Sequence, residues 1–191
     1  LDRLDALAAE AVGPVPQVVL RITPGVHAHT HEFIATGQDD SKFGFNLANG
    51  DALRAVDHAR RSPAMELVGV HCHIGSNVFE ASSFAKAAEV MADFAVPLDL
   101  PELILGGGLG VAYVETEEAP TLTQWGHVLR DACESLGVTA RVSVEPGRSI
   151  VASTSISGCC QAAATFSIRP NRTRCSTTAG VFVRLHTTTS G

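Results

Sequence analysis

The stretch MELVGVHCHIGSN, residues 65–77, joins a short apolar run to a polar end that contains a Gly-Ser pair. The apolar part, residues 65–74, is predicted to be a β-strand. In an extended strand alternate residues share a face, so His71 and His73 would point the same way. Such a pair suits a metal site of the His-x-His kind. It equally suits one ring stacked on a flat cofactor while the other packs or orients it.

The same arrangement of an apolar strand with a polar end recurs along the chain. The motifs TPG, HCHIGS, GGGLG and EPGR each follow a predicted strand. Strands that alternate with helices are typical of parallel βαβ units, and (β/α)8 barrels carry their active sites at the carboxyl ends of the strands. Four strands make about half a barrel, so we predict an α/β fold, a partial (β/α)8 TIM-type barrel. The predicted strands are 17–22, 65–74, 102–105 and 140–145, and the predicted helices are 2–12, about 48–61, 80–96 and 121–137.

Composition narrows the possible partners. The chain has 191 residues, 45% hydrophobic and 18% charged, which is ordinary for a globular domain. A net charge of -6 gives no electrostatic reason to expect binding to nucleic acid or to an anionic membrane. No apolar run approaches the ~20 residues that cross a bilayer, and no signal-peptide pattern opens the chain. Five cysteines without disulfide or zinc spacing suit reduced thiols, hence the cytoplasm.

The composition changes near Ala152. All 20 acidic residues lie in residues 1–151, whereas residues 152–191 hold no Asp, Glu or Lys, four Arg and 14 Ser or Thr. We therefore divide the chain into a partial barrel, 1–151, and an atypical Ser/Thr/Arg-rich tail, 152–191. The tail is expected to be disordered or translated in a shifted reading frame. Because the chain begins at Leu1 in helix-like sequence, we expect it to be a piece of a longer protein.

The polar strand ends offer the groups that a phosphorylated heterocycle needs. Successive glycines at 106–108 would let backbone N–H groups approach an anion, although a flexible turn would look the same. Glu145 could hold a protonated ring nitrogen and Arg148 could bind a phosphate, although the two could also form a surface salt bridge. Ser76 could add a hydroxyl. Together these groups suit pyridoxal 5′-phosphate (PLP) better than a metal.

Four motifs carry a resemblance to a known family: RITPGVHAHTHEFIATGQDDSKFGF (21–45), GVHCHIGSN (69–77), LGGGLGVAY (105–113) and VEPGRSIV (144–151). Over residues 15–151 the chain resembles the diaminopimelate decarboxylases, alanine-racemase-like PLP enzymes that convert meso-diaminopimelate to L-lysine and CO2. The resemblance implies that HAHTH, 27–31, is a polar loop rather than a metal site, and that His71 packs or supports its neighbour. The resemblance implies that His73 stacks on the PLP ring and is the catalytic candidate, and that Glu145 binds the ring nitrogen. It implies that Arg148 binds the phosphate or the substrate carboxylate. The residues that it places at the phosphate are Ser76, Gly106, Gly107 and Gly108.

The resemblance also implies parts that this sequence does not supply. The family holds PLP through a lysine on an early strand, and neither Lys42 nor Lys86 stands in that context. It completes its site with a C-terminal β-domain, often across a homodimer interface. We therefore expect the isolated chain to be inactive. Two alternatives stay open: a decarboxylase of the same fold acting on ornithine or arginine, and a metal-dependent barrel of the amidohydrolase type built on His71 and His73.

Overall fold

The computed structural model describes residues 1–10, 13–26, 43–113, 118–152, 166–167 and 181–184. The helices are α1 (Asp2–Glu10), α2 (Asp51–Arg61), α3 (Ala81–Ala95), α4 (Leu122–Ser135) and α5 (Gly147–Val151), with a 3-10 turn, η1 (Val96–Leu98). The strands are β1 (Gln17–Thr23), β2 (Phe45–Asn46), β3 (Glu66–Cys72), β4 (Glu102–Gly107), β5 (Arg141–Glu145), β6 (Phe166–Ser167) and β7 (Val181–Arg184). None of the helices described here is long and apolar enough to cross a membrane.

The strands form one sheet in the order β2-β1-β3-β4-β5-β6, and β7 also pairs with β1. The pairs from β2 to β5 are parallel, whereas β6 and β7 run antiparallel to their partners. The predicted α/β fold with parallel βαβ units is therefore confirmed. Each of the four predicted strands is present, and β4 continues two residues further, through Gly107.

Some elements were not predicted, and some predictions cannot be placed. The two-residue strand β2 and the five-residue helix α5 are too short to give a periodic signal in the sequence. The segment HAHTH, 27–31, lies outside the described residues. So does most of the tail, of which β6 and β7 are described; its predicted disorder or shifted frame stays a prediction.

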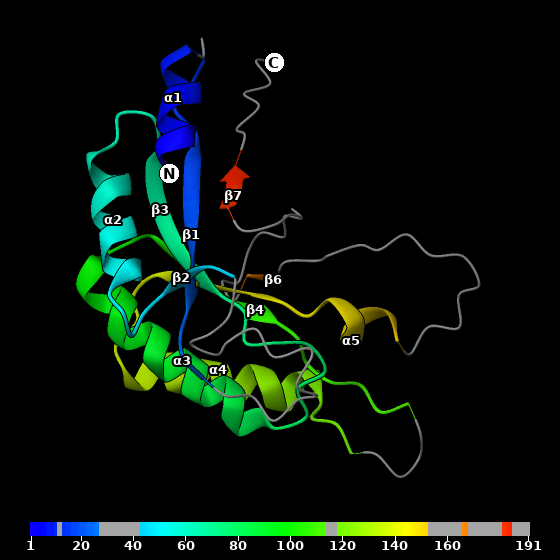
Figure 1. Cartoon of the computed structure of the whole chain (residues 1–191). Helices are drawn as coiled ribbons and strands as arrows, with labels where there is room; N and C mark the ends of the chain where they lie inside the picture. Colours follow the sequence, from blue (N-terminus) through cyan, green and yellow to red (C-terminus); the bar gives the residue numbers. More distant parts are fainter. Residues whose placement is uncertain (11–12, 27–42, 114–117, 153–165, 168–180, 185–191) are drawn as a thin grey trace, which may run out of the picture.

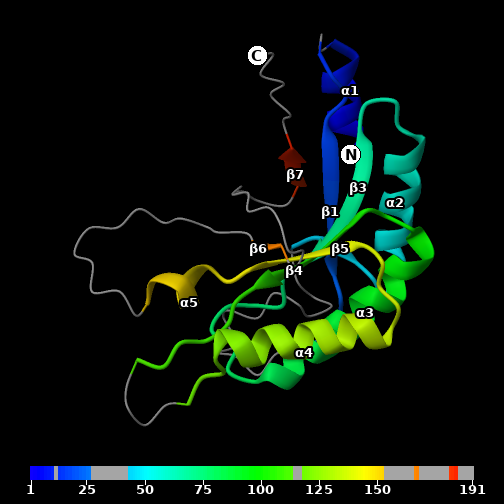
Figure 2. The ribbon, with the colours of Figure 1, turned by 180° about the vertical axis from the view of Figure 1, so that it is seen from behind.

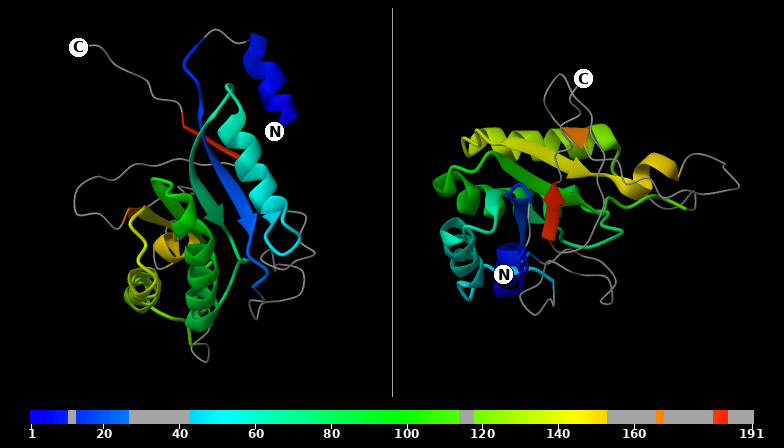
Figure 3. Two further views of the ribbon diagram at one scale, coloured as in Figure 1. Left: turned by 90° about the vertical axis from the view of Figure 1, so that its left-hand side faces the viewer. Right: turned by 90° about the horizontal axis from the view of Figure 1, so that it is seen from above.

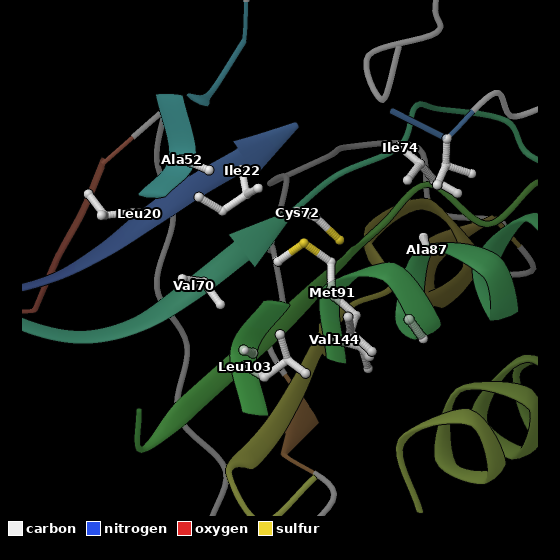
Figure 4. Packing of buried hydrophobic residues seen from close by; sticks show 14 of the residues in the cluster. Leu20, Ile22, Ala52, Val70, Cys72, Ile74, Ala87, Met91, Leu103 and Val144 are labelled. Carbon is white, nitrogen blue, oxygen red and sulfur yellow. The ribbon is translucent and has the colours of Figure 1, made fainter. Parts of the chain in front are cut away.

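Helices α2, α3 and α4 lie on one side of the sheet (Figures 1 and 3). The core forms between these helices and the alternate strand residues that face them, such as Leu20, Val70 and Leu103, each less than 1% exposed (Figure 4). Trp125 of α4, predicted to be a core or interface residue, is buried and meets Phe84 of α3 edge to face, with ring centroids 5.5 Å apart. This packing holds the helices against the strands and fixes which strand face is left for the site.

The opposite face of the sheet carries a row of mostly polar side chains. Arg21 on β1 is in register with His71 on β3, His71 with Ile104 on β4, and Ile104 with Ser143 on β5. Residues in register on parallel strands share a face, so these side chains lie on the side away from the core helices. Glu145 lies two residues beyond Ser143 and therefore projects from the same face. The sheet thus has an apolar helix-covered side and a polar side near the carboxyl ends of its strands.

Candidate functional site

The loops that follow β3 and β4 are joined to each other. Val78 donates its N–H to the Gly108 carbonyl at 2.9 Å, and Gly110 donates its N–H to the Val78 carbonyl at 2.8 Å. These bonds form a short parallel bridge between Val78 and Leu109. The bridge places Ser76 next to the glycines: a Cβ atom on Gly108 would stand 3.5 Å from the Ser76 Cα.

Each of the three glycines is needed for close packing of the backbone. A Cβ on Gly106 would collide with the Cys72 carbonyl, one on Gly107 with the Glu145 carbonyl, and one on Gly108 with the Gly75 carbonyl. Gly106 and Gly108 also have φ values of 60° and 98°, which other residues rarely adopt. The glycines therefore bring the ends of β3, β4 and β5 together. Their binding to a phosphate stays a prediction.

The two histidines make different contacts. His71 is 2% exposed and donates its Nε2–H to the Glu145 Oε2, with 3.3 Å between the two atoms. His73 accepts the Gly107 N–H at its Nδ1, with a distance of 3.4 Å. Burial, followed by the charges of Arg21 and His71, lowers the pKa of His73 to about 4. The His73 ring is therefore neutral at pH 7 and carries its proton on Nε2, which suits a ring that stacks rather than one that donates charge.

Glu145 is held as a carboxylate. Burial would raise its pKa, but the hydrogen bond from His71 and the charge on His71 act against burial. His73 and Arg21 also lower the pKa of Glu145, which as a result lies below its ordinary value. A partly buried, ionised carboxylate beside a neutral imidazole and a glycine-lined loop fits a basic, phosphorylated heterocycle, since the carboxylate can accept a hydrogen bond from a protonated ring nitrogen.

Arg21 belongs to this site and was missed from the sequence. Its guanidinium stacks over the Phe43 ring at 5.0 Å from the centroid, and its attraction to Glu145 partly offsets the lowering of the Arg21 pKa by burial. A signal was available: Arg21 interrupts the apolar run QVVLRI at a position that alternates with the buried Leu20 and Ile22. That alternation places its side chain on the polar face of the sheet.

Arg148 lies on the short helix α5, which follows the end of β5. It is exposed on α5 and donates to the Tyr113 hydroxyl at 3.0 Å. Helix α5 continues beyond the end of β5 and away from the core helices (Figures 1 and 2). Among the described residues, no ion pair joins Arg148 to Glu145. The structure brings together His73, Ser76, the three glycines and Glu145, and leaves Arg148 at the margin.

Among the described residues, no group of potential metal ligands includes His71 or His73. Within the ranges that the structure describes, the group of potential ligands close enough to share an ion is Asp2, Asp5 and His58, where α1 meets α2. His58 and Asp5 there form an ion pair with 2.6 Å between Nε2 and Oδ2. His71 instead engages Glu145, which leaves the cofactor interpretation as the one that the geometry favours.

The low pKa of His73 predicts how stability depends on pH. In the unfolded chain the ring takes up a proton near pH 6.5, whereas in the folded protein it does so only near 4. Between these values the unfolded state binds more protons, so the free energy of unfolding falls as the pH falls, by at most ~1.4 kcal/mol per pH unit from this group. Urea unfolding at pH 6.5, 5.5 and 4.5 should show a shallower dependence for His73→Phe than for the wild type. Equal slopes would mean that His73 titrates normally when folded.

Comparison with known proteins shows what this chain is similar to. Residues 1–152 match the model of the pyridoxal-dependent decarboxylase, pyridoxal binding domain. The chain is 45% identical over 161 residues to the diaminopimelate decarboxylase of Corynebacterium efficiens, and this match covers 78% of this chain and 35% of the relative. It is 41% identical over 160 residues to the diaminopimelate decarboxylase of Staphylococcus aureus, and that match covers 79% of this chain and 37% of the relative. The crystal structure of diaminopimelate decarboxylase from Helicobacter pylori complexed with L-lysine is similar over 79% of this chain and 39% of that chain, with a TM-score of 0.69 and 33% identity. The chain thus spans about a third of the length of the curated relatives it matches.

Proposed function

The chain belongs to the pyridoxal-dependent decarboxylase family, and we propose that it forms part of the PLP site of an enzyme that converts meso-diaminopimelate to L-lysine and CO2. The observation that carries this proposal is the ionised Glu145, held beside the neutral His73 at the carboxyl ends of three neighbouring strands. The similarity to diaminopimelate decarboxylases, over 78% and 79% of this chain, supports the substrate.

PLP, when bound, supplies an electron sink for the electrons that the departing carboxylate leaves behind. The residues of this chain bind and orient it. Glu145 accepts a hydrogen bond from the protonated ring nitrogen and keeps the proton there. His73 stacks on the ring without adding a charge that would compete with it. The backbone of the glycine loop, Gly106, Gly107 and Gly108, and the hydroxyl of Ser76 bind the phosphate.

In this proposal Arg148 binds an anionic group of the ligand from the edge of the site. Its guanidinium is exposed and orients toward Tyr113, outside the cluster that contains Glu145 and His73. From α5 it binds the phosphate or the carboxylate of the substrate, because its planar fork suits either anion. This role is compatible with a side chain that stays accessible to ligands.

The 191-residue chain alone is proposed not to decarboxylate. The covalent attachment of PLP needs a lysine at the strand ends. Lys86 lies on α3, exposed and paired with Glu89 at 3.1 Å, and Lys42 lies outside the described residues. We place the working enzyme in the cytoplasm as a homodimer acting on a small amino acid. The family resemblance supports the dimer, and the buried free thiols of Cys72 and Cys133 suit a reducing compartment.

A hybrid enzyme tests the proposal. Residues 1–152 replace the matching segment of the Corynebacterium efficiens diaminopimelate decarboxylase, and CO2 release is measured from meso-diaminopimelate, ornithine and arginine. We expect turnover of meso-diaminopimelate by the hybrid and none by the 191-residue chain. A hybrid that binds PLP but acts only on ornithine or arginine would transfer the proposal to another decarboxylase. A hybrid that binds PLP and acts on none would refute it.

A further inference from the structure

The contact between His71 and Glu145 crosses an intervening strand. His71 projects from β3 and Glu145 from β5, with β4 between them. The register between β4 and β5 shifts between Ile104 and Gly107, and Gly107 is the β4 residue in register with Glu145. The hydrogen bond from His71 to Glu145 crosses β4 at this end of the strand. Gly107, whose Cβ would collide with the Glu145 carbonyl, therefore adds no side chain of β4 beside the carboxylate.

We propose that His71 is a positioning residue that holds Glu145 by its Oε2 atom and keeps it ionised, so that Oε1 faces the bound cofactor. This inference rests on the proposed function for the identity of the group that Oε1 meets. A carboxylate only accepts hydrogen bonds, so the Nε2 of His71 must be the donor. The His71 side chain is 3% exposed and that of Glu145 is 25% exposed. The side of Glu145 toward His71 is therefore enclosed, and the remaining exposure is available to a ligand.

Other groups near Glu145 act differently from His71. His73 is neutral at pH 7 and is engaged by the Gly107 N–H. Arg21, on β1, attracts the carboxylate and is stacked on Phe43. Cys72 points to the opposite face of β3, and burial raises the pKa of its thiol to about 12, so it carries no charge. Among these groups, His71 is the one whose hydrogen bond to Glu145 fixes the direction of the carboxylate.

The role can be measured in the 191-residue chain without PLP. The probe is the 13C resonance of the Glu145 carboxyl, titrated by NMR in the wild type, His71→Leu and His71→Gln. We expect His71→Leu to raise the pKa of Glu145 by about 1 unit. His71→Gln should restore most of the wild-type value, because its amide N–H can replace the imidazole donor. His58→Leu, which removes a histidine bonded to Asp5, is the matched control and should leave the pKa of Glu145 unchanged.

The outcomes separate this role from simple packing. If His71→Leu leaves the pKa of Glu145 unchanged, or if His71→Gln behaves like His71→Leu, the inference is overturned. His71→Asn keeps a polar side chain that is too short to reach Glu145, so it replaces the leucine variant if that variant does not fold. Amide spectra establish that each variant is folded before its titration is compared.

A second measurement links the position of Glu145 to the cofactor. In the hybrid enzyme, we expect PLP to bind His71→Leu about 10-fold more weakly than the wild type, since binding must then order a carboxylate that has lost its hydrogen bond, and His71→Gln within a few-fold of it. Equal affinities for all three would overturn the part of the inference that concerns the cofactor. If the hybrid enzyme with the wild-type segment binds no PLP, the proposed function of this chain is contradicted instead, and the titration still decides whether His71 controls Glu145.

Discussion

Glu145→Gln is expected to lower the turnover number of the hybrid decarboxylase by ~100-fold or more, which is typical for the loss of one strong electrostatic interaction at a reacting centre. Glutamine has nearly the same shape and can still accept the N–H of His71. It lacks the negative charge that would keep the ring nitrogen of PLP protonated. The loss should therefore appear in kcat for meso-diaminopimelate while PLP stays bound.

Glu66→Gln is the matched control. Glu66 opens β3 at the far end of the strand, is exposed, and accepts a hydrogen bond from Gln17 at 3.0 Å. The same chemical change there removes a carboxylate without touching the strand ends where the site lies, so kcat should not change. A hybrid carrying Glu145→Gln with undiminished turnover would remove Glu145 from the mechanism.

Gly107→Ala is expected to destabilise the fold by ~3 kcal/mol or more, at the upper end of what overpacking costs. The added methyl would overlap the carbonyl of Glu145 on β5, and that carbonyl belongs to the backbone, which cannot turn aside as a side chain can. Either β4 and β5 separate or the end of the sheet distorts. Urea unfolding, followed by circular dichroism, measures the loss.

Gly126→Ala is the opposite case in the same chain. Gly126 lies within α4, and apart from its chain neighbours and the backbone of its own helix no atom stands within 4 Å of the position its Cβ would take. Alanine removes conformational freedom from the unfolded chain and should stabilise the protein by about 0.5–1 kcal/mol. If both substitutions gave the same change in unfolding free energy, the close approach of β4 to β5 would be wrong.

The sequence predicted the parts of the site that depend on local pattern. The alternation of an extended strand predicted the face on which His71 lies, and the polar motifs marked where the strands end. The sequence did not predict which groups meet across strands, because the register between distant segments depends on packing. The contact of His71 with Glu145 joins residues 74 positions apart and needs β4 to lie between them.

Arg148 and Arg21 also show that the sequence does not predict which side chains meet. The EPGR motif places Arg148 three residues after Glu145, but the chain enters α5 at Gly147, and Arg148 contacts Tyr113. Arg21 lies more than a hundred residues before Glu145, and only the order of the sheet brings its charge near the carboxylate. Closeness in sequence therefore did not predict which of these two arginines acts on the Glu145 carboxylate.

Because both faces of β3 are buried, the protein should tolerate substitutions in this strand better than insertions or deletions. Cys72 faces the helices, whereas His71 faces Glu145, and each side chain is at most 2% exposed. Side chains in a strand alternate with a period of two, so inserting or deleting a single codon within β3 would exchange the two faces beyond that point. Imidazoles would then enter the apolar core, and a thiol would stand where the carboxylate needs a donor. A deletion of one residue in β3 should be far more damaging than any single substitution of Cys72 by another small apolar residue.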